Sequence, residues 1–308
     1  MNKNKKTIPQ LVADLSLLFV ALSWGATFII VKTAVEDLPP LPFLAIRFAL
    51  AFITLIPFLY LQREHINKGA IIKGLLVGVF LFLGYVSQTI GLQYTTASNA
   101  GFITGLNVVI VPLLVAIYQK SFPRRAIMIG ALCATAGLAL LSIGPNFTIN
   151  SGDPIVLICA FCFAAHIFFV GRFAPEVNAT VLASFQILTV ALLSGFGTLI
   201  IPQPAMVFSS YVWFGLILTA LICTSLAFFL QSKMQQFTSA SHTAIIFAGE
   251  PVFAALFAFL LAGEMLSNRG LLGAAFVLGG ILIAEFSSIR KLKSFDDSED
   301  ENHIKHSS

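Results

Sequence analysis

Long apolar segments follow one another along the chain and are separated by short polar connections. Each holds about 20 residues, which at about 1.5 Å of rise per residue is enough for an α-helix to cross a bilayer. We therefore predict an all-α polytopic membrane protein, with a basic head (1–11) and a charged tail (289–308). The ten predicted transmembrane helices are residues 12–34, 42–62, 71–93, 96–119, 125–145, 153–173, 179–201, 209–232, 238–262 and 268–288.

The two halves of the chain resemble each other. A single displacement, which takes Gln88 to Gln231, aligns 88–140 with 231–283 without a gap. Further identical pairs include Gln93/Gln236, Thr95/Thr238, Ser98/Ser241, Gly130/Gly273 and Gly137/Gly280. Each half contains five spans, an odd number, so the second half must enter the membrane from the opposite side. This predicts two inverted repeats, 12–145 and 153–288, an arrangement that in transporters encloses a site near the bilayer midplane.

Charged residues predict the orientation. If the head is cytoplasmic, the cytoplasmic ends of the spans and the two termini hold all but three of the 18 Lys and Arg residues. Of the three exceptions, Arg269 lies in an external connection, and Lys32 and Arg47 lie in the outer parts of their spans, where their long stems can extend outward. Basic residues favour the cytoplasmic side, so both termini are predicted to be cytoplasmic.

Composition limits the class of protein further. Of the 308 residues, 57% are hydrophobic and 10% are charged, whereas a soluble domain is about one quarter charged. The net charge of +4 is small and scattered, so nucleic acid is not an expected partner. Cys159 and Cys162 have the spacing of a redox or metal motif, but no second pair completes it. We expect these cysteines to pack as small apolar residues, and we expect no cofactor and no metal.

Glu250 stands near the middle of span 238–262 and is followed by Pro251. A carboxylate at that depth is costly unless it faces a partner or a wet cavity, and the proline frees a backbone carbonyl beside it. Two interpretations stay open: a kinked helix in which Glu250 meets a neighbouring donor, or a residue that lines a solute pathway. The repeat pairs Glu250 with Asn107, and Pro112 is expected to loosen that span similarly.

Other polar or aromatic residues are expected in the same layer. Trp24 lies one turn from Thr27, and Thr104 shares a helix face with Asn107. Asn and Thr in a membrane can also simply join two helices, and His166 is as compatible with a hydrogen-bonded core residue as with a functional one. The candidate substrate-binding residues are Trp24, Thr27, Gln88, Thr104, Asn107, His166 and Glu250. Of these, Glu250 and His166 are also the candidates for proton coupling.

Two aspartates occupy equivalent places near the start of each half. A slightly shorter displacement than the one above aligns Asp14 with Asp153. Asp153 precedes Pro154, and aspartate caps helices while proline fits their first turn. Both aspartates are therefore expected to begin helices as caps.

Several stretches carry a resemblance to a known family. They are SWGATFIIVK (23–32), Pro42 with Arg47, TTASNAGFITGLNVVIVPLL (95–114) and TSASHTAIIFAGEPVFAALFAFLLAGE (238–264). Together with the repeats, they resemble EamA-type members of the drug/metabolite transporter superfamily, over residues 12–288. The resemblance implies a carrier of ten helices in two inverted repeats, which usually exports amino acids or other small metabolites. The first repeat departs from the pattern, since Lys120-Ser121 stands where the second has Gly263-Glu264.

These observations favour a secondary or facilitative transporter of a bacterial plasma membrane that works by alternating access. No phosphate-binding loop ending in Gly-Lys-Ser/Thr is present. The expected substrate is an amino acid or a related compound, moved outward, and the alternative is efflux of drugs or cationic compounds. A membrane-embedded enzyme is an alternative of another class, but the sequence lacks His-Glu-x-x-His and Gly-x-Ser-x-Gly motifs. Expected partners are a small-molecule substrate, the lipid bilayer and, as a hypothesis, protons, with the chain acting as a monomer or a homodimer.

Overall fold

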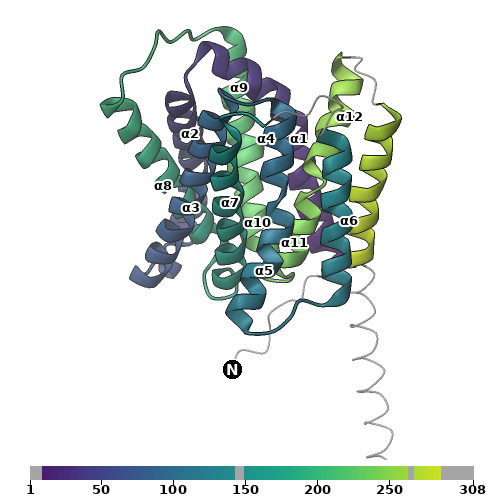
Figure 1. Ribbon diagram of the computed structural model, residues 1–308. Coiled ribbons are helices and arrows are strands. Elements are labelled where there is room, and N and C mark those ends of the chain that lie inside the picture. The colour runs from purple at the N-terminus through teal and green to yellow at the C-terminus, as the bar shows by residue number, and fades with distance from the viewer. Residues whose placement is uncertain (1–8, 143–148, 263–266, 286–308) are drawn as a thin grey trace, which may run out of the picture.

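The computed structural model describes residues 9–142, 149–262 and 267–285. Within these ranges, ten helical stretches are long and apolar enough to cross a membrane, which confirms the ten predicted spans. They run roughly side by side as one bundle (Figure 1). Large apolar side chains cover its outside, such as Leu199 and Phe196 with exposed fractions of 86% and 62%, as a surface that faces lipid requires. The predicted head, except for its last residues, and the predicted tail lie outside the described residues.

The first half of the chain supplies five spans, the fourth of which is interrupted. Its elements are α1 (Gln10–Asp37), α2 (Pro40–Leu61), a 3₁₀ turn η1 (Arg63–His65), α3 (Lys68–Leu92), α4 (Ala97–Gly105), α5 (Asn107–Gln119) and α6 (Arg125–Ser142). The second half follows the same plan, with an additional π-helix in its third span. Its elements are α7 (Asp153–Phe173), α8 (Ala179–Ile200), α9 (Ser210–Ala220), the π-helix η2 (Leu221–Leu226), α10 (Ala227–Met234), α11 (Ala240–Phe247), α12 (Glu250–Ala262) and a last helix, Asn268–Glu285.

Short polar residues define where many of the helices begin. Thr96 accepts a hydrogen bond from the backbone of Asn99 at the start of α4, and Ser239 does the same for His242 at the start of α11. Such caps satisfy donors that the first turn leaves free. The predicted capping role of Asp14 is wrong, because α1 already begins at Gln10. Asp153 does begin α7, but as its first helical residue rather than as its cap.

The inverted repeat is visible in the helix bounds and in one contact. The displacement that takes Gln88 to Gln231 also takes the first residues of α4, α5 and α6 to the first residues of α11, α12 and the last helix. A Cβ atom added to Gly130 would lie 2.8 Å from the carbonyl oxygen of Gly280, and one added to Gly137 would lie 2.5 Å from that of Gly273. The order of these contacts means that α6 and the last helix are antiparallel. Equivalent helices of the two repeats therefore run in opposite directions.

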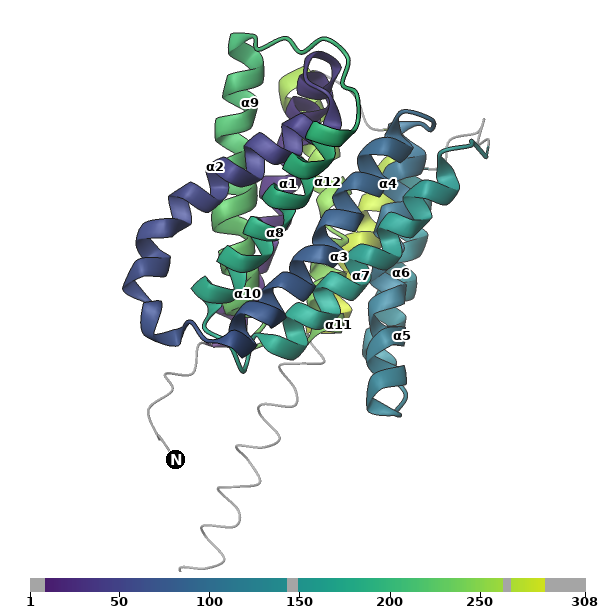
Figure 2. The same cartoon turned by 90° about the vertical axis from the view of Figure 1, so that its left-hand side faces the viewer.

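The two repeats interlock in the bundle. Helix α1 packs against α10, α11 and α12 of the second repeat, and α7 packs against α3, α4 and α5 of the first. Figure 2 shows α7 alongside α3. Asp14 of α1 and Glu285 of the last helix both contact His242, so the described chain starts and ends on one side. We call this side the terminal end of the bundle.

Candidate functional site

Glu250 is the first residue of a half-helix. Span 9 is broken at Ala248 and Gly249, where the amide of Gly249 donates to the carbonyl of Ile246 over 3.0 Å. Pro251 lies in the first turn of α12, where a backbone N–H would have no partner within the helix. The predicted kink is thus a complete break. The Glu250 side chain is partly exposed and accepts no hydrogen bond from the described residues.

Asn107 occupies the equivalent position in span 4. That span breaks between α4 and α5 at Leu106, and Asn107 is the first residue of α5. Its side chain is also partly exposed, and it forms no hydrogen bond with any other part of the chain that the structure describes. Pro112 lies inside α5 and not at the break, so it does not play the part of Pro251. A negative charge is favoured at the start of either half-helix by the helix dipole.

The surroundings of Glu250 come from several helices. Its charge lies within electrostatic range of Tyr85 on α3, Cys159 on α7 and Cys223 in the π-helix. Glu250 therefore faces the inside of the bundle and not the lipid. Its side chain keeps a partly exposed surface there.

Two of the predicted site residues meet where α3, α4 and α7 come together. Gln88 donates to the hydroxyl of Thr104 over 3.4 Å, and this hydroxyl lies 3.7 Å from the sulfur of Cys159. Helices α3, α4 and α7 are thereby joined next to Glu250. The contacts fit the interpretation in which such groups join helices.

The π-helix connects the predicted residues of span 1. Its Cys223 carbonyl accepts a hydrogen bond of 2.8 Å from the indole N–H of Trp24. The hydroxyl of Thr27 lies 3.2 Å from the Cys223 sulfur and also donates to the carbonyl of Ser23 in its own helix. Single-turn π segments interrupt the regular hydrogen bonding of a helix and often occur at functional sites. Here the segment supplies a carbonyl that accepts hydrogen bonds from side chains of other helices.

Arg47 is buried in the same network. Its Nε donates to the hydroxyl of Thr224 over 2.8 Å, and its Nη2 donates to the Cys223 carbonyl over 3.5 Å. The guanidinium carbon also lies 5.4 Å from the centre of the Tyr85 ring. The exposed fraction of Arg47 is 4%, so the prediction that its stem extends outward is wrong. The π-helix provides acceptors inside the bundle, which makes the inward direction favourable.

His166 is held by a chain of polar contacts within the core. Its Nε2 lies 2.7 Å from the side-chain oxygen of Gln186, whose amide donates to the hydroxyl of Ser232 over 3.0 Å. The His166 ring also meets the Phe228 ring edge-on, with centres 5.7 Å apart. Because only 3% of His166 is exposed, the geometry favours the core interpretation. Its role in proton coupling stays a prediction.

Comparisons with known proteins match most of the chain. A model of the EamA-like transporter family matches residues 11–143 and 150–286. An uncharacterized transporter of Archaeoglobus fulgidus is 36% identical over 285 residues, which are 90% of this chain and 86% of the relative. YedA, an uncharacterized inner membrane transporter of Escherichia coli K12, is 26% identical over 148 residues, covering 46% of this chain and 47% of YedA. A crystal structure with 18% identity has a TM-score of 0.78 and covers 91% of this chain and 98% of its own.

Proposed function

The chain belongs to the EamA-like transporter family, and from this premise we propose that it exports an amino acid or a related small metabolite by alternating access. It is a multi-pass membrane transporter whose two repeats are related by inversion. Inverted repeats let one half move against the other, so that a site near the midplane opens to each side in turn. This movement of one repeat against the other requires no ATP-binding domain, as is usual for a secondary or facilitative carrier.

The observation that carries the proposal is the pair of unpartnered polar side chains at the two helix breaks. Glu250 and Asn107 begin half-helices, are partly exposed, and form no hydrogen bond with the described residues. An amino acid has an ammonium group, which the Glu250 carboxylate can bind, and a carboxylate, which the Asn107 amide can receive at the start of α5. One ionic contact and one amide contact would thus match the substrate at its two ends.

The other predicted residues are proposed to form the walls of the site. In this proposal Trp24 contributes an aromatic face, and the hydroxyls of Thr27 and Thr104 and the amide of Gln88 contribute polar groups. His166 is proposed to hold α7, α8 and α10 together through Gln186 and Ser232. Rigid walls of this kind position a small solute without requiring a dedicated partner for each of its atoms.

A second candidate substrate is an organic cation. Trp24 lies edge-on to Phe247, with ring centres 4.9 Å apart, and 5.8 Å from the Phe228 ring. Aromatic faces attract cations, and with Glu250 they could hold a drug-like cation that has no carboxylate. The Asn107 contact separates the two candidates, because only an amino acid uses it.

Transport in proteoliposomes tests the proposal. Vesicles with the purified protein are loaded with radiolabelled amino acids or with tetraphenylphosphonium, and efflux is measured. Amino acid efflux that falls in both Glu250→Gln and Asn107→Ala supports the proposal, and efflux of the cation alone, unaffected by Asn107→Ala, supports the alternative. Thr135→Ala is a matched control, since the Thr135 hydroxyl donates only to the Ala131 carbonyl of its own helix. Normal amino acid transport in both site variants would contradict the site.

Imposing a pH gradient on the same vesicles separates three roles of Glu250. If Glu250 binds the substrate ammonium group, Glu250→Gln weakens transport at every pH. If it couples transport to protons, the Gln variant loses its dependence on the gradient but still exchanges substrate. If it only supports the helix break, the Gln variant transports like the wild type.

The orientation is proposed from the charges. The terminal end, with Lys73 and Arg124, is the predicted cytoplasmic end. Single cysteines introduced at positions 67 and 124 should react only from the inside of cells, and those at 150 and 267 only from the outside. Labelling of the unmodified chain measures the background reaction of its four native cysteines. External labelling at position 67 would overturn the orientation.

A further inference from the structure

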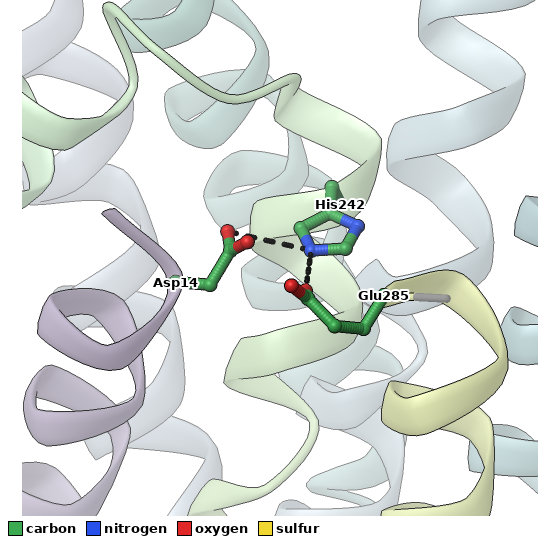
Figure 3. A group of neighbouring side chains, drawn as sticks. All are labelled: Asp14, His242 and Glu285. Atoms are coloured by element: carbon green, nitrogen blue, oxygen red, sulfur yellow. Dashed lines mark hydrogen bonds and ion pairs between the residues drawn. The ribbon is translucent and has the colours of Figure 1, made fainter. Parts of the chain in front are cut away.

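Three titratable side chains from three spans meet at the terminal end. Figure 3 shows His242 of α11 between Asp14 of α1 and Glu285 of the last helix. The His242 Nε2 lies 2.9 Å from a Glu285 oxygen and 3.4 Å from an Asp14 oxygen. The exposed fractions of the three side chains are 2% for His242, 8% for Asp14 and 16% for Glu285. We call this group the terminal cluster.

Neutral groups position one side of the terminal cluster. The Gln10 amide nitrogen donates to both Asp14 oxygens, at 3.0 and 2.9 Å, and to the hydroxyl of Thr238 at 2.9 Å. Asp14 therefore accepts hydrogen bonds as a carboxylate does. Two buried atoms, Nδ1 of His242 and Oε1 of Glu285, have no partner among the described residues. An additional proton on this Glu285 oxygen would break none of the hydrogen bonds that are present.

The charges of the terminal cluster do not balance without bound protons. With a neutral imidazole the two carboxylates leave a net charge of −2, and an imidazolium reduces it to −1. A second proton, on Glu285, makes the cluster neutral. Burying an unbalanced charge is costly, and no Lys or Arg in the described ranges forms an ion pair with either carboxylate. The closed packing of α1, α11 and the last helix therefore favours the states with more protons.

Within the described part of the chain, the helices packed around the terminal cluster contribute no further titratable group to it. Among the described residues they carry Lys120, Arg124 and Arg125, which are exposed at the α5–α6 connection, Arg172, which pairs with Glu176, Lys233 at the end of α10, and Glu250 in the middle of the bundle. Arg269, Glu36, Asp37 and Asp153 lie at the opposite end. His166 contacts Gln186 in the core, and Tyr118 accepts a hydrogen bond from Arg172. Among the described residues, Asp14, His242 and Glu285 are therefore the titratable side chains gathered at this place.

The opposite end of the bundle holds the equivalent arrangement without titratable partners. There Asp153 accepts hydrogen bonds from the hydroxyl of Thr95, from the Asn99 amide at 3.2 Å, and from the backbone of Asn150 at 2.9 Å. The displacement between the repeats relates Thr95 to Thr238, Asn99 to His242 and Ser142 to Glu285. In the sequence, the imidazole and the carboxylate of the terminal end thus correspond to the Asn99 amide and the Ser142 hydroxyl.

We propose that Asp14, His242 and Glu285 form a proton-binding site that holds the terminal end closed and opens it when protons are released. The inference rests on the proposed alternating access, since a carrier of this kind must open each end in turn. When the pH on this side rises, His242 loses its proton and two carboxylates face each other across a neutral ring. Their repulsion favours the separation of α1, α11 and the last helix, and entering water then solvates the charges. Closure takes the protons up again.

Backbone hydrogen exchange of the full chain in lipid nanodiscs, without substrate, tests the proposal between pH 5.5 and 8.5. After correction for the intrinsic exchange rate, protection at the start of α1 and in α11 should fall with rising pH. Release of one proton on opening corresponds to about tenfold per pH unit. Protection at the starts of α4 and α7 should stay constant. Since no substrate is present, a failure to transport amino acids leaves this result unaffected.

A double variant supplies the matched control. His242→Asn with Glu285→Ser reproduces the residues of the opposite end and should remove the pH dependence at the terminal end. If the double variant does not fold, Glu285→Gln takes its place. This variant keeps the shape of the side chain and should reduce the pH dependence at the terminal end. Equal pH dependence at both ends of the wild type, or pH dependence that persists in these variants, would overturn the proposal. Zn²⁺ that raises the melting temperature of the wild type alone would overturn it too, in favour of a metal site.

Discussion

At the break in span 4 the second half-helix begins with Asn107, whereas at the break in span 9 it begins with Glu250. The residues that follow the first half-helices, Leu106 and Ala248, both have φ −60° and ψ −14°, although the displacement relates Leu106 to Gly249 and the second break is one residue longer. The first break forms without an adjacent proline, so Pro251 is compatible with the break but not required for it. The two repeats therefore share the backbone of the site and differ in its charge.

The same division extends to the rest of the molecule. The small-residue contact between α6 and the last helix uses equivalent glycines of both repeats. In contrast, the π-helix occurs in span 8, while α3, the equivalent span, is a continuous α-helix. Arg47 and Trp24 both hydrogen-bond to this π-helix, since its Cys223 carbonyl accepts from each of them. The two repeats thus share the glycine contact, whereas the π-helix and the hydrogen bonds to it occur in one repeat without an equivalent in the other.

Moving the carboxylate from one break to the other should have the largest effect. Glu250→Asn should lower substrate affinity by about 10- to 100-fold, because a hydrogen bond to a charged group contributes about 1.5–3 kcal/mol. Adding Asn107→Glu to this variant should restore part of the affinity if both breaks face one substrate. Ligand-induced shifts of the melting temperature measure the affinities. If the double variant binds no better than Glu250→Asn, the two breaks do not share a substrate.

The shared glycine contact predicts a loss of stability. In Gly137→Ala the new methyl group would lie 2.5 Å from the Gly273 carbonyl oxygen. The two helices must then separate, at a cost of about 1–3 kcal/mol as for other overpacked sites. Thermal unfolding in detergent measures it. Gly279→Ala is the matched control, since no atom lies within 4 Å of its added Cβ, and it should be neutral or slightly stabilising. Equal melting temperatures for the two variants would contradict the close approach.

The π-helix contact with Arg47 predicts a smaller loss. Thr224→Val removes the acceptor of the Arg47 Nε and leaves a buried donor unpaired, which costs about 1–2 kcal/mol. Thr219→Val is the control, because Thr219 is equally buried but its hydroxyl donates to carbonyls of its own helix. Unfolding in detergent should separate the two variants. A loss of the same size in both would show that the hydroxyl of Thr224 is not needed by Arg47.

The smallest effect is expected at the surface of the terminal end. Hydrogen bonds from Lys73 and Arg172 hold the pKa of Glu176 below its ordinary value. A lowered pKa stabilises the folded state above the ordinary pKa, and this contribution is lost as the pH falls through the lowered value. Glu176→Gln should therefore melt slightly below the wild type at pH 7, and the difference should narrow on acidification. Glu64→Gln, at a carboxylate that contacts only His65, should show no such difference.

The spans, their number and the inverted repeat could be predicted from apolar segment length and from the displacement that aligns the two halves. Glu250 and Asn107 were identified because a polar residue in an apolar segment is visible in the sequence itself. The partners of Arg47 could not be predicted, because the π-helix that provides them has no signature in the apolar pattern of span 8. The orientation and the roles of the site residues stay predictions.

The terminal cluster was missed for a related reason. Asp14 lies in the first span, and His242 and Glu285 lie near the ends of the last two, where single polar residues are common. Periodicity does not determine which span ends meet. One signal was available, since the displacement that pairs Asn107 with Glu250 also pairs Asn99 with His242. Two such substitutions of an amide by a titratable group in one broken span indicate that the charges of the repeats differ systematically.

The joining of the first span to the last two has a consequence for the order of synthesis. Gln10 and Thr238, which hydrogen-bond in the finished protein, are 228 residues apart. At about 5–20 residues per second, roughly 10–50 s pass between the appearance of the two residues at the ribosome. During that time Asp14 has none of its partners from the second repeat. Its position within the first turns of α1 keeps it close to the membrane surface, where water and headgroups can solvate the carboxylate while the remaining spans are made.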